Sequence, residues 1–299
     1  MAEKKTELRK IRDFGGNLSD TFDFIRQYFR PMIFAFAGIA GVFMLAMSLM
    51  NEVVTSNAFS TLHELRSQGS VGLPLVSAFL YSSYFSMPFL MNLVSIWVGY
   101  TAMLVVIVAF MKYVDQHEGT APGFEEVWKI FRRYYPRMLL YMIPVTVMIA
   151  GGTLLCVVPG IFLSVLLVPF GWVVMTEDVG LSAAVTRCFD LSRDHFWISL
   201  AVYLVSTLIY FSASFSIGMV GGMITLLAGL LTNRDVSSAV GILNAVLRVF
   251  GFLFYAIFLV SAGLHYYNLV ERLDAVGITR RIEEIGTRRE TGEDQQENN

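Results

Sequence analysis

LVSIWVGYTAMLVVIVAFM, the stretch at residues 93–111, decides the fold because it carries no charged side chain over its whole length. Its apolar residues would cover every side of a helix, and about 20 such residues span a hydrocarbon layer of roughly 30 Å at about 1.5 Å per residue. A transmembrane β-strand would instead alternate apolar and polar residues over about ten positions. The stretch therefore predicts a membrane-spanning α-helix.

The rest of the chain has the same apolar character. Of its 299 residues, 55% are hydrophobic and 15% are charged, whereas soluble domains are about 25% charged. Apolar blocks occur at residues 31–50, 88–111, 138–158, 161–176, 196–218 and 238–264. We therefore expect an all-α integral membrane protein with about six transmembrane helices, arranged as three hairpins and accompanied by cytoplasmic amphipathic interfacial helices.

Two segments leave the number of spans open. The fourth block is short, and Pro169 interrupts its hydrogen-bond ladder. It either crosses as a kinked helix or forms a shallow re-entrant pair with the third block, joined at Pro159 and Gly160. Residues 219–231 are also apolar, and they either extend the fifth span or lie in the outer interface.

The distribution of charge predicts the orientation. The net charge of −2 points to no nucleic acid partner, but almost all Lys and Arg residues fall on one side of the six blocks, leaving Arg66 and Arg234 on the other. Because basic residues are retained in the cytoplasm, both termini are expected there, and a bacterial inner membrane is the expected location. The predicted organisation is a cytoplasmic segment with an amphipathic helix at 1–30, a six-span membrane domain at 31–270 and a cytoplasmic tail at 271–299, the end of which is expected to be disordered.

Two cytoplasmic segments align without a gap, FIRQYFRPM at residues 24–32 and IFRRYYPRM at residues 130–138. Their mixture of aromatic and basic residues is typical of helices that lie in the membrane interface, and Pro31 and Pro136 are expected to mark the turn into the bilayer. The alignment indicates either true internal repeats or the aromatic and basic residues that mark any membrane boundary. The candidate contacts with the membrane surface are Arg26, Arg30, Arg132, Arg133 and Arg137.

The strongest single candidate for a functional residue is Arg248, which lies well inside the sixth block. An unpaired Arg at such a position costs on the order of 3 kcal/mol. Glu52, at the outer end of the first block, is its possible partner, and Asn244 lies one helical turn before it on the same face. Arg248 either belongs to a substrate or ion site, or reaches to the interface or into a buried hydrogen-bond network.

Catalytic chemistry has little support in the sequence. Asp115, His117 and Glu118 gather at the inner end of the second block, where a solvated turn explains them better than a metal or acid–base site. Nucleotide loops, zinc-protease helices and nucleophile elbows are missing. Cys156 and Cys188 fall on opposite sides of the membrane, so no disulfide is expected. We therefore expect no catalytic residues, no metal and no cofactor.

One region resembles a known group of proteins. It comprises PGIFL at residues 159–163, VPF at 168–170 and EDVGLSAAVTRCFDLSRDHFW at 177–197. This pattern resembles the bacterial membrane proteins of the YciC family and the membrane domain attached to some glycerophosphodiester phosphodiesterases, which usually have Ser in place of Cys188. The resemblance implies a six-span helical bundle with cytoplasmic interfacial helices. It implies no catalysis, because the phosphodiesterase chemistry belongs to a separate soluble domain.

Three functions remain as hypotheses. The first is a non-enzymatic membrane module in the lipid bilayer that binds lipid, including anionic lipid, or another membrane protein. The second is a small transporter or channel for a solute or ion that uses Arg248. The third and weakest is a membrane enzyme that uses Asp115, His117 and Glu118.

Overall fold

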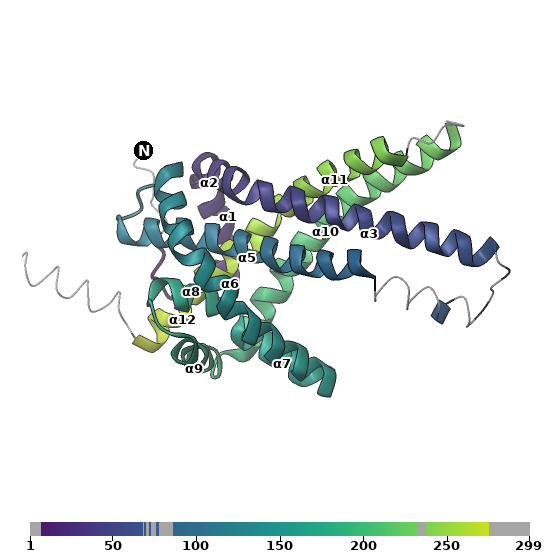
Figure 1. Cartoon of the computed structure of the whole chain (residues 1–299). Coiled ribbons are helices and arrows are strands. Elements are labelled where there is room, and N and C mark those ends of the chain that lie inside the picture. Colours follow the sequence, from purple (N-terminus) through teal and green to yellow (C-terminus); the bar gives the residue numbers. More distant parts are fainter. Residues whose placement is uncertain are drawn as a thin grey trace, which may run out of the picture.

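The structure, a computed structural model, describes residues 7–67, 69, 72, 76–77, 86–231 and 237–274. Every regular element within these ranges is a helix (Figure 1). In chain order they are α1 (Phe14–Gln27), α2 (Phe29–Ala35), the π-helical turn η1 (Phe36–Ala40), α3 (Gly41–Ser67), α5 (Met87–Gln116), α6 (Phe124–Leu155), α7 (Val157–Leu167), α8 (Phe170–Thr176), α9 (Leu181–Ser192), α10 (Phe196–Leu231), α11 (Ser237–Leu253) and α12 (Tyr255–Asp274). The predicted all-α fold is confirmed.

Six segments of the described chain are long and apolar enough to cross a membrane. They are Phe29–Ala58, Met87–Gln116, Phe124–Leu155, Val157–Thr176, Phe196–Ala228 and Ala239–Asp274. The predicted number is therefore confirmed. Residues 219–231 continue α10 without a break, and the fifth apolar segment reaches Ala228. The predicted tail beyond Asp274 lies outside the described residues.

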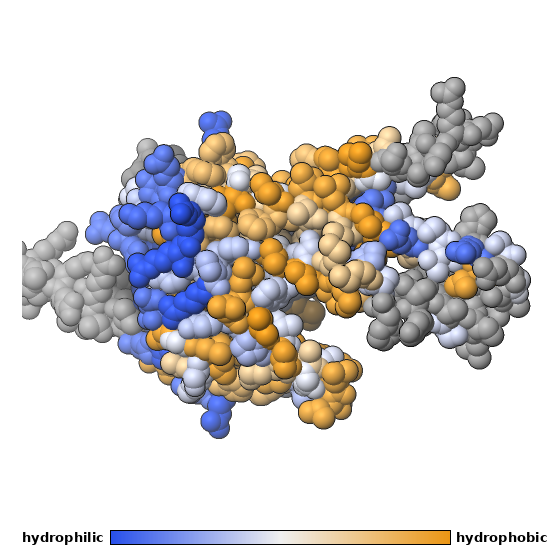
Figure 2. Space-filling model, in the orientation of Figure 1, coloured by the Kyte–Doolittle hydropathy of each residue, from blue (hydrophilic) through white to orange (hydrophobic). Residues whose placement is uncertain are grey.

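Polar surface is concentrated at one end of the molecule (Figure 2). The N-terminal segment, α9 and the end of α12 meet there, and we call it the basic end (Figure 1). At the opposite end, which we call the distal end, α10 gives way to α11. Apolar side chains cover most of the surface between the two ends in Figure 2, as lipid-facing helices require.

The core lies toward the basic end and is built around α5. Residues 101–111 of this helix are buried apart from Leu104, and α5 contacts α3, α6, α8 and α12. Gly263 allows α12 to approach α5 and α8 closely, since an added Cβ would lie 2.5 Å from Sδ of Met111 and 2.6 Å from Nε1 of Trp172. Both of these side chains are fully buried.

Helix α1 packs against the protein rather than lying free in the interface. Asp13 caps it by accepting a hydrogen bond from the Gly16 backbone N–H, and Phe24 is fully buried in an aromatic cluster with Tyr28 and Phe110. The prediction of an amphipathic helix is correct, but its apolar face is covered by α12 and α10. An interfacial helix and a helix on a protein surface share the same pattern, so the sequence does not separate them.

The two aligned segments, residues 24–32 and 130–138, have the same pattern of buried side chains but different backbone conformations. Tyr28 and Tyr134 are buried at equivalent positions, and so are Met32 and Met138. The first segment breaks at Tyr28, between α1 and α2, whereas the second runs inside α6 without interruption. The predicted turn at Pro136 is therefore wrong, because α6 passes straight through that residue.

Helices α6 and α7 form a hairpin whose turn lies earlier than predicted. The chain becomes extended at Cys156, and Pro159 and Gly160 already belong to α7. Gly160 lets the two helices touch, since an added Cβ would lie 2.7 Å from Cα of Thr153. Pro169 separates α7 from α8, as its missing N–H predicts.

Candidate functional site

A cavity of about 1290 Å³ lies in the distal half of the molecule, between α3, α5, α10 and α11. Small-molecule pockets measure roughly 300–1,000 Å³, so this one has room for a larger ligand. Its apolar walls include Met47, Ile96, Leu247 and Phe252. Its polar walls include Asn51, Glu52, Thr55, Ser56, Asn57, Ser60, Tyr100, Tyr210, Ser214, Thr225, Asn244 and Arg248.

Arg248 pairs with Glu52, the partner predicted from the sequence. A terminal nitrogen of its guanidinium lies 3.5 Å from Oε2 of Glu52, and the other terminal nitrogen donates a hydrogen bond to Oδ1 of Asn51. The side chains of Arg248 and Glu52 are 34% and 24% exposed. The pair is therefore neither sealed in the core nor released to the surface, and both members line the cavity.

Close packing of α11 on α3 holds this pair in place. Gly241 lies directly against Glu52, since an added Cβ would be 3.2 Å from Cγ of that residue. One turn further along α11, the Ala245 carbonyl accepts a hydrogen bond of 2.8 Å from the Ser48 hydroxyl. Such small residues allow the backbones of membrane helices to approach each other.

Asn244 joins the opposite wall of the cavity. Its Nδ2 donates a hydrogen bond to Oγ1 of Thr225 on α10, over 2.9 Å, and its side-chain oxygen lies against Gly221. All three predicted candidates, Arg248, Glu52 and Asn244, therefore meet at one cavity. Asn51 was not predicted, although its place beside Glu52 in the chain was the available signal.

Two serines along α10 form contacts with α12 and α11. The Ser206 hydroxyl donates to Ser261 on α12 over 2.7 Å, and the Ser214 hydroxyl donates to the Gly251 carbonyl over 3.1 Å. Further along, Gly218 and Gly222 face the cavity, and a Cβ at either position would meet no atom within 4 Å.

The predicted surface arginines divide into two groups. Arg26, Arg30, Arg132 and Arg133 are exposed. Arg137 is instead half-buried and engaged, because it pairs with Asp178 at 2.8 Å and donates to the Val179 carbonyl. The four exposed side chains remain candidates for contact with a membrane surface.

The polar residues at the end of α5 do not form a reactive cluster. Arg9 binds both carboxylate oxygens of Asp115, at 3.1 and 2.8 Å, and the His117 ring stacks on Tyr113. Glu118 lies in the left-handed turn that ends the helix. In the part of the chain that the structure describes, no group of three His, Cys, Asp or Glu side chains is arranged to hold a metal ion.

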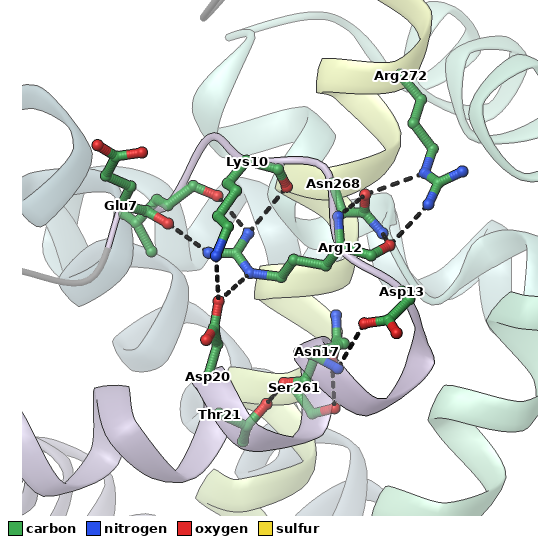
Figure 3. Close-up of polar contacts among 12 residues, drawn as sticks. Glu7, Lys10, Arg12, Asp13, Asn17, Asp20, Thr21, Ser261, Asn268 and Arg272 are labelled. Carbon is green, nitrogen blue, oxygen red and sulfur yellow. Dashed lines mark hydrogen bonds and ion pairs between the residues drawn. The ribbon is translucent and has the colours of Figure 1, made fainter.

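The sequence did not reveal how the N-terminal segment is held at the basic end (Figure 3). The Arg12 side chain is fully buried, binds Asp20 at 2.6 Å and donates to the backbone carbonyls of residues 7, 8 and 10. Asn268 on α12 exchanges two hydrogen bonds with the Arg12 backbone, and Arg272 donates to the same carbonyl over 2.7 Å. The segment is therefore fastened to the last helix.

A second polar network ties α9 to the end of α12. Arg187 bridges Glu177 and Asp274, and Glu177 accepts a hydrogen bond of 3.1 Å from the Tyr266 hydroxyl. Partial burial alone would lower the pKa of Arg187, but the hydrogen bond to Asp274 and the charge of Glu177 raise it. The contacts of Arg187 with Glu177 and Asp274 therefore favour its charged form and connect α9 to α12.

Comparisons of the chain with family models, with curated proteins and with solved structures found no match. The resemblance to the YciC family therefore stays a prediction that rests on residues 159–197.

Proposed function

We propose that this chain is a non-enzymatic membrane module that binds a lipid-type amphipathic molecule in the cavity between α3, α5, α10 and α11. The observation that carries the proposal is the placement of the Arg248–Glu52 pair in a cavity of about 1290 Å³ with apolar walls. A polar headgroup would lie beside the pair, and hydrocarbon would follow Met47, Ile96 and Phe252. Ligand sites combine such apolar walls with a few placed polar groups.

The proposed location is a bacterial inner membrane with both termini in the cytoplasm. Support comes from the bias of Lys and Arg toward the basic end, which would place the exposed Arg26, Arg30, Arg132 and Arg133 near anionic headgroups. The cavity would then open within the outer half of the membrane.

Labelling of single cysteines tests this orientation. The experiment uses a Cys156→Ser, Cys188→Ala background and a membrane-impermeant maleimide. We expect the reagent to label Glu64→Cys in intact spheroplasts, and to label Arg132→Cys only after the spheroplasts are lysed. Both positions are exposed, on α3 and α6 respectively. The reverse pattern would invert the proposed topology.

Filling the cavity tests the binding proposal. Gly222 lines the cavity and a Cβ there would meet no atom within 4 Å, so Gly222→Phe places a large side chain at the cavity wall. We expect the detergent-purified variant to retain several-fold less copurified lipid than the wild type, because the ring occupies the space of the ligand. Mass spectrometry of the extracted lipid measures the difference.

The matched control is Gly151→Phe on α6. This glycine is also helical, a Cβ there also meets nothing within 4 Å, and the residue does not line the cavity. It is expected to retain lipid at the wild-type level. Equal retention by both variants and the wild type would contradict binding in the cavity.

A transporter is the second candidate, and the placement of Arg248 and Glu52 within membrane-spanning helices favours it. Toward the basic end, however, residues 105–111 of α5 are closely packed and buried, so a path across the membrane would need rearrangement of the core. Solute flux into liposomes that disappears with Arg248→Ala would favour this candidate over lipid binding.

A further inference from the structure

We propose that the cavity selects a headgroup that carries both charges, a phosphate and an ammonium, over one that carries a net negative charge. This inference rests on the proposed binding function and names the headgroup class for the same cavity. It follows from the charge that the site presents and from the chemistry of the groups around it.

The charged groups of the cavity balance each other. Among the lining side chains that the structure describes, Arg248 is the one cation and Glu52 the one anion, and they lie 3.5 Å apart. A phosphate alone would gain the attraction of Arg248 but meet the repulsion of Glu52 at nearly the same distance. An added ammonium removes that repulsion, because it places a positive charge beside the carboxylate.

Arg248 keeps the donors that a phosphate needs. A guanidinium has five N–H groups, and the hydrogen bond to Asn51 and the ion pair with Glu52 occupy one terminal nitrogen each. The remaining donors belong to a side chain that is 34% exposed and lines the cavity. A phosphate oxygen can therefore bind Arg248 while the pair with Glu52 stays in place.

The other polar side chains of the wall, within the described part of the chain, are neutral. Thr55, Ser56, Asn57 and Ser60 follow Glu52 along α3, and Asn244 and Thr225 pair with each other across from them. Hydroxyl and amide groups can bind a phosphate oxygen or an ammonium without changing the net charge of the site. The wall therefore adds hydrogen bonds and leaves the selection of charge to Arg248 and Glu52.

In the test, delipidated full-length protein is incubated in detergent with an equimolar mixture of dioleoyl phosphatidylethanolamine and dioleoyl phosphatidylglycerol. Mass spectrometry then measures the ratio of the two lipids that remain bound to the protein. The wild type is expected to enrich the ethanolamine lipid roughly fivefold over the input. Glu52→Gln removes the carboxylate charge and is expected to reverse the ratio in favour of the glycerol lipid.

Glu64→Gln is the matched control, because this exposed glutamate lies on the same helix and does not line the cavity. It is expected to leave the ratio unchanged. A wild-type preference for the glycerol lipid, or the same shift with Glu52→Gln and Glu64→Gln, would overturn the headgroup inference alone. The total lipid bound, compared with that of Gly222→Phe, reports on the cavity itself, and wild-type protein that retains neither lipid would overturn both proposals.

Discussion

Replacing Arg12 by methionine is expected to lower the melting temperature of the detergent-solubilised protein by roughly 10 °C. The Arg12 side chain is fully buried, and its loss removes the closest partner of Asp20 and the hydrogen bonds that Arg12 donates to the carbonyls of residues 7, 8 and 10 (Figure 3). Removing one member of a fully buried ion pair costs about 3–5 kcal/mol. Because Asp20 is 22% exposed and keeps Lys10 at 3.9 Å, we expect a loss of about 3 kcal/mol, at the lower end of that range. Methionine keeps an apolar side chain of similar length, so the decrease in melting temperature reports on the loss of the guanidinium group.

Arg26→Met is the control for this experiment. Arg26 lies on α1, near the same end of the molecule, but its side chain is exposed. Its replacement is expected to change the melting temperature by no more than about 1 °C, as is usual for exposed surface positions. If both variants melted at the same temperature, the network around Arg12 would not hold the N-terminal segment to α12.

The membrane architecture could be predicted from the sequence because it depends on local composition. A run such as residues 93–111 has no soluble alternative, so the six spans follow from hydrophobicity and length. The path through Pro136 could not be predicted in this way. Arg132, whose carbonyl loses its helical donor at that proline, is exposed, so polar surroundings can satisfy the carbonyl and α6 continues.

The candidate site was partly predictable for a related reason. A charge within an apolar block needs a partner, which singled out Arg248 and then Glu52. The cavity itself depends on which faces of α3, α10 and α11 meet, and one sequence does not define that packing. Arg12 escaped notice because a basic residue in a basic segment looks solvated, and only the folded chain shows that Asn268 and Asp20 enclose it.

Replacing Gly263 by alanine is expected to have the other large effect on stability. The added methyl group would lie 2.5 Å from Sδ of Met111 and 2.6 Å from Nε1 of Trp172, and both side chains are fully buried. Overpacking of this kind costs about 1–3 kcal/mol, because neither neighbour has free space to move into. We expect a lower melting temperature and a lower yield of monodisperse protein by size-exclusion chromatography.

Two further variants show whether the close approach of α12 is the cause. Gly151→Ala, where a Cβ meets nothing within 4 Å, is expected to be neutral or slightly stabilising, because alanine favours helix more than glycine does. Met111→Ala combined with Gly263→Ala makes room for the new methyl group, so the double variant is expected to lose less stability than the sum of the two single losses. Strictly additive losses of stability would mean that Gly263 and Met111 act independently. The contact between α12 and α5 would then not be the reason that position 263 requires glycine.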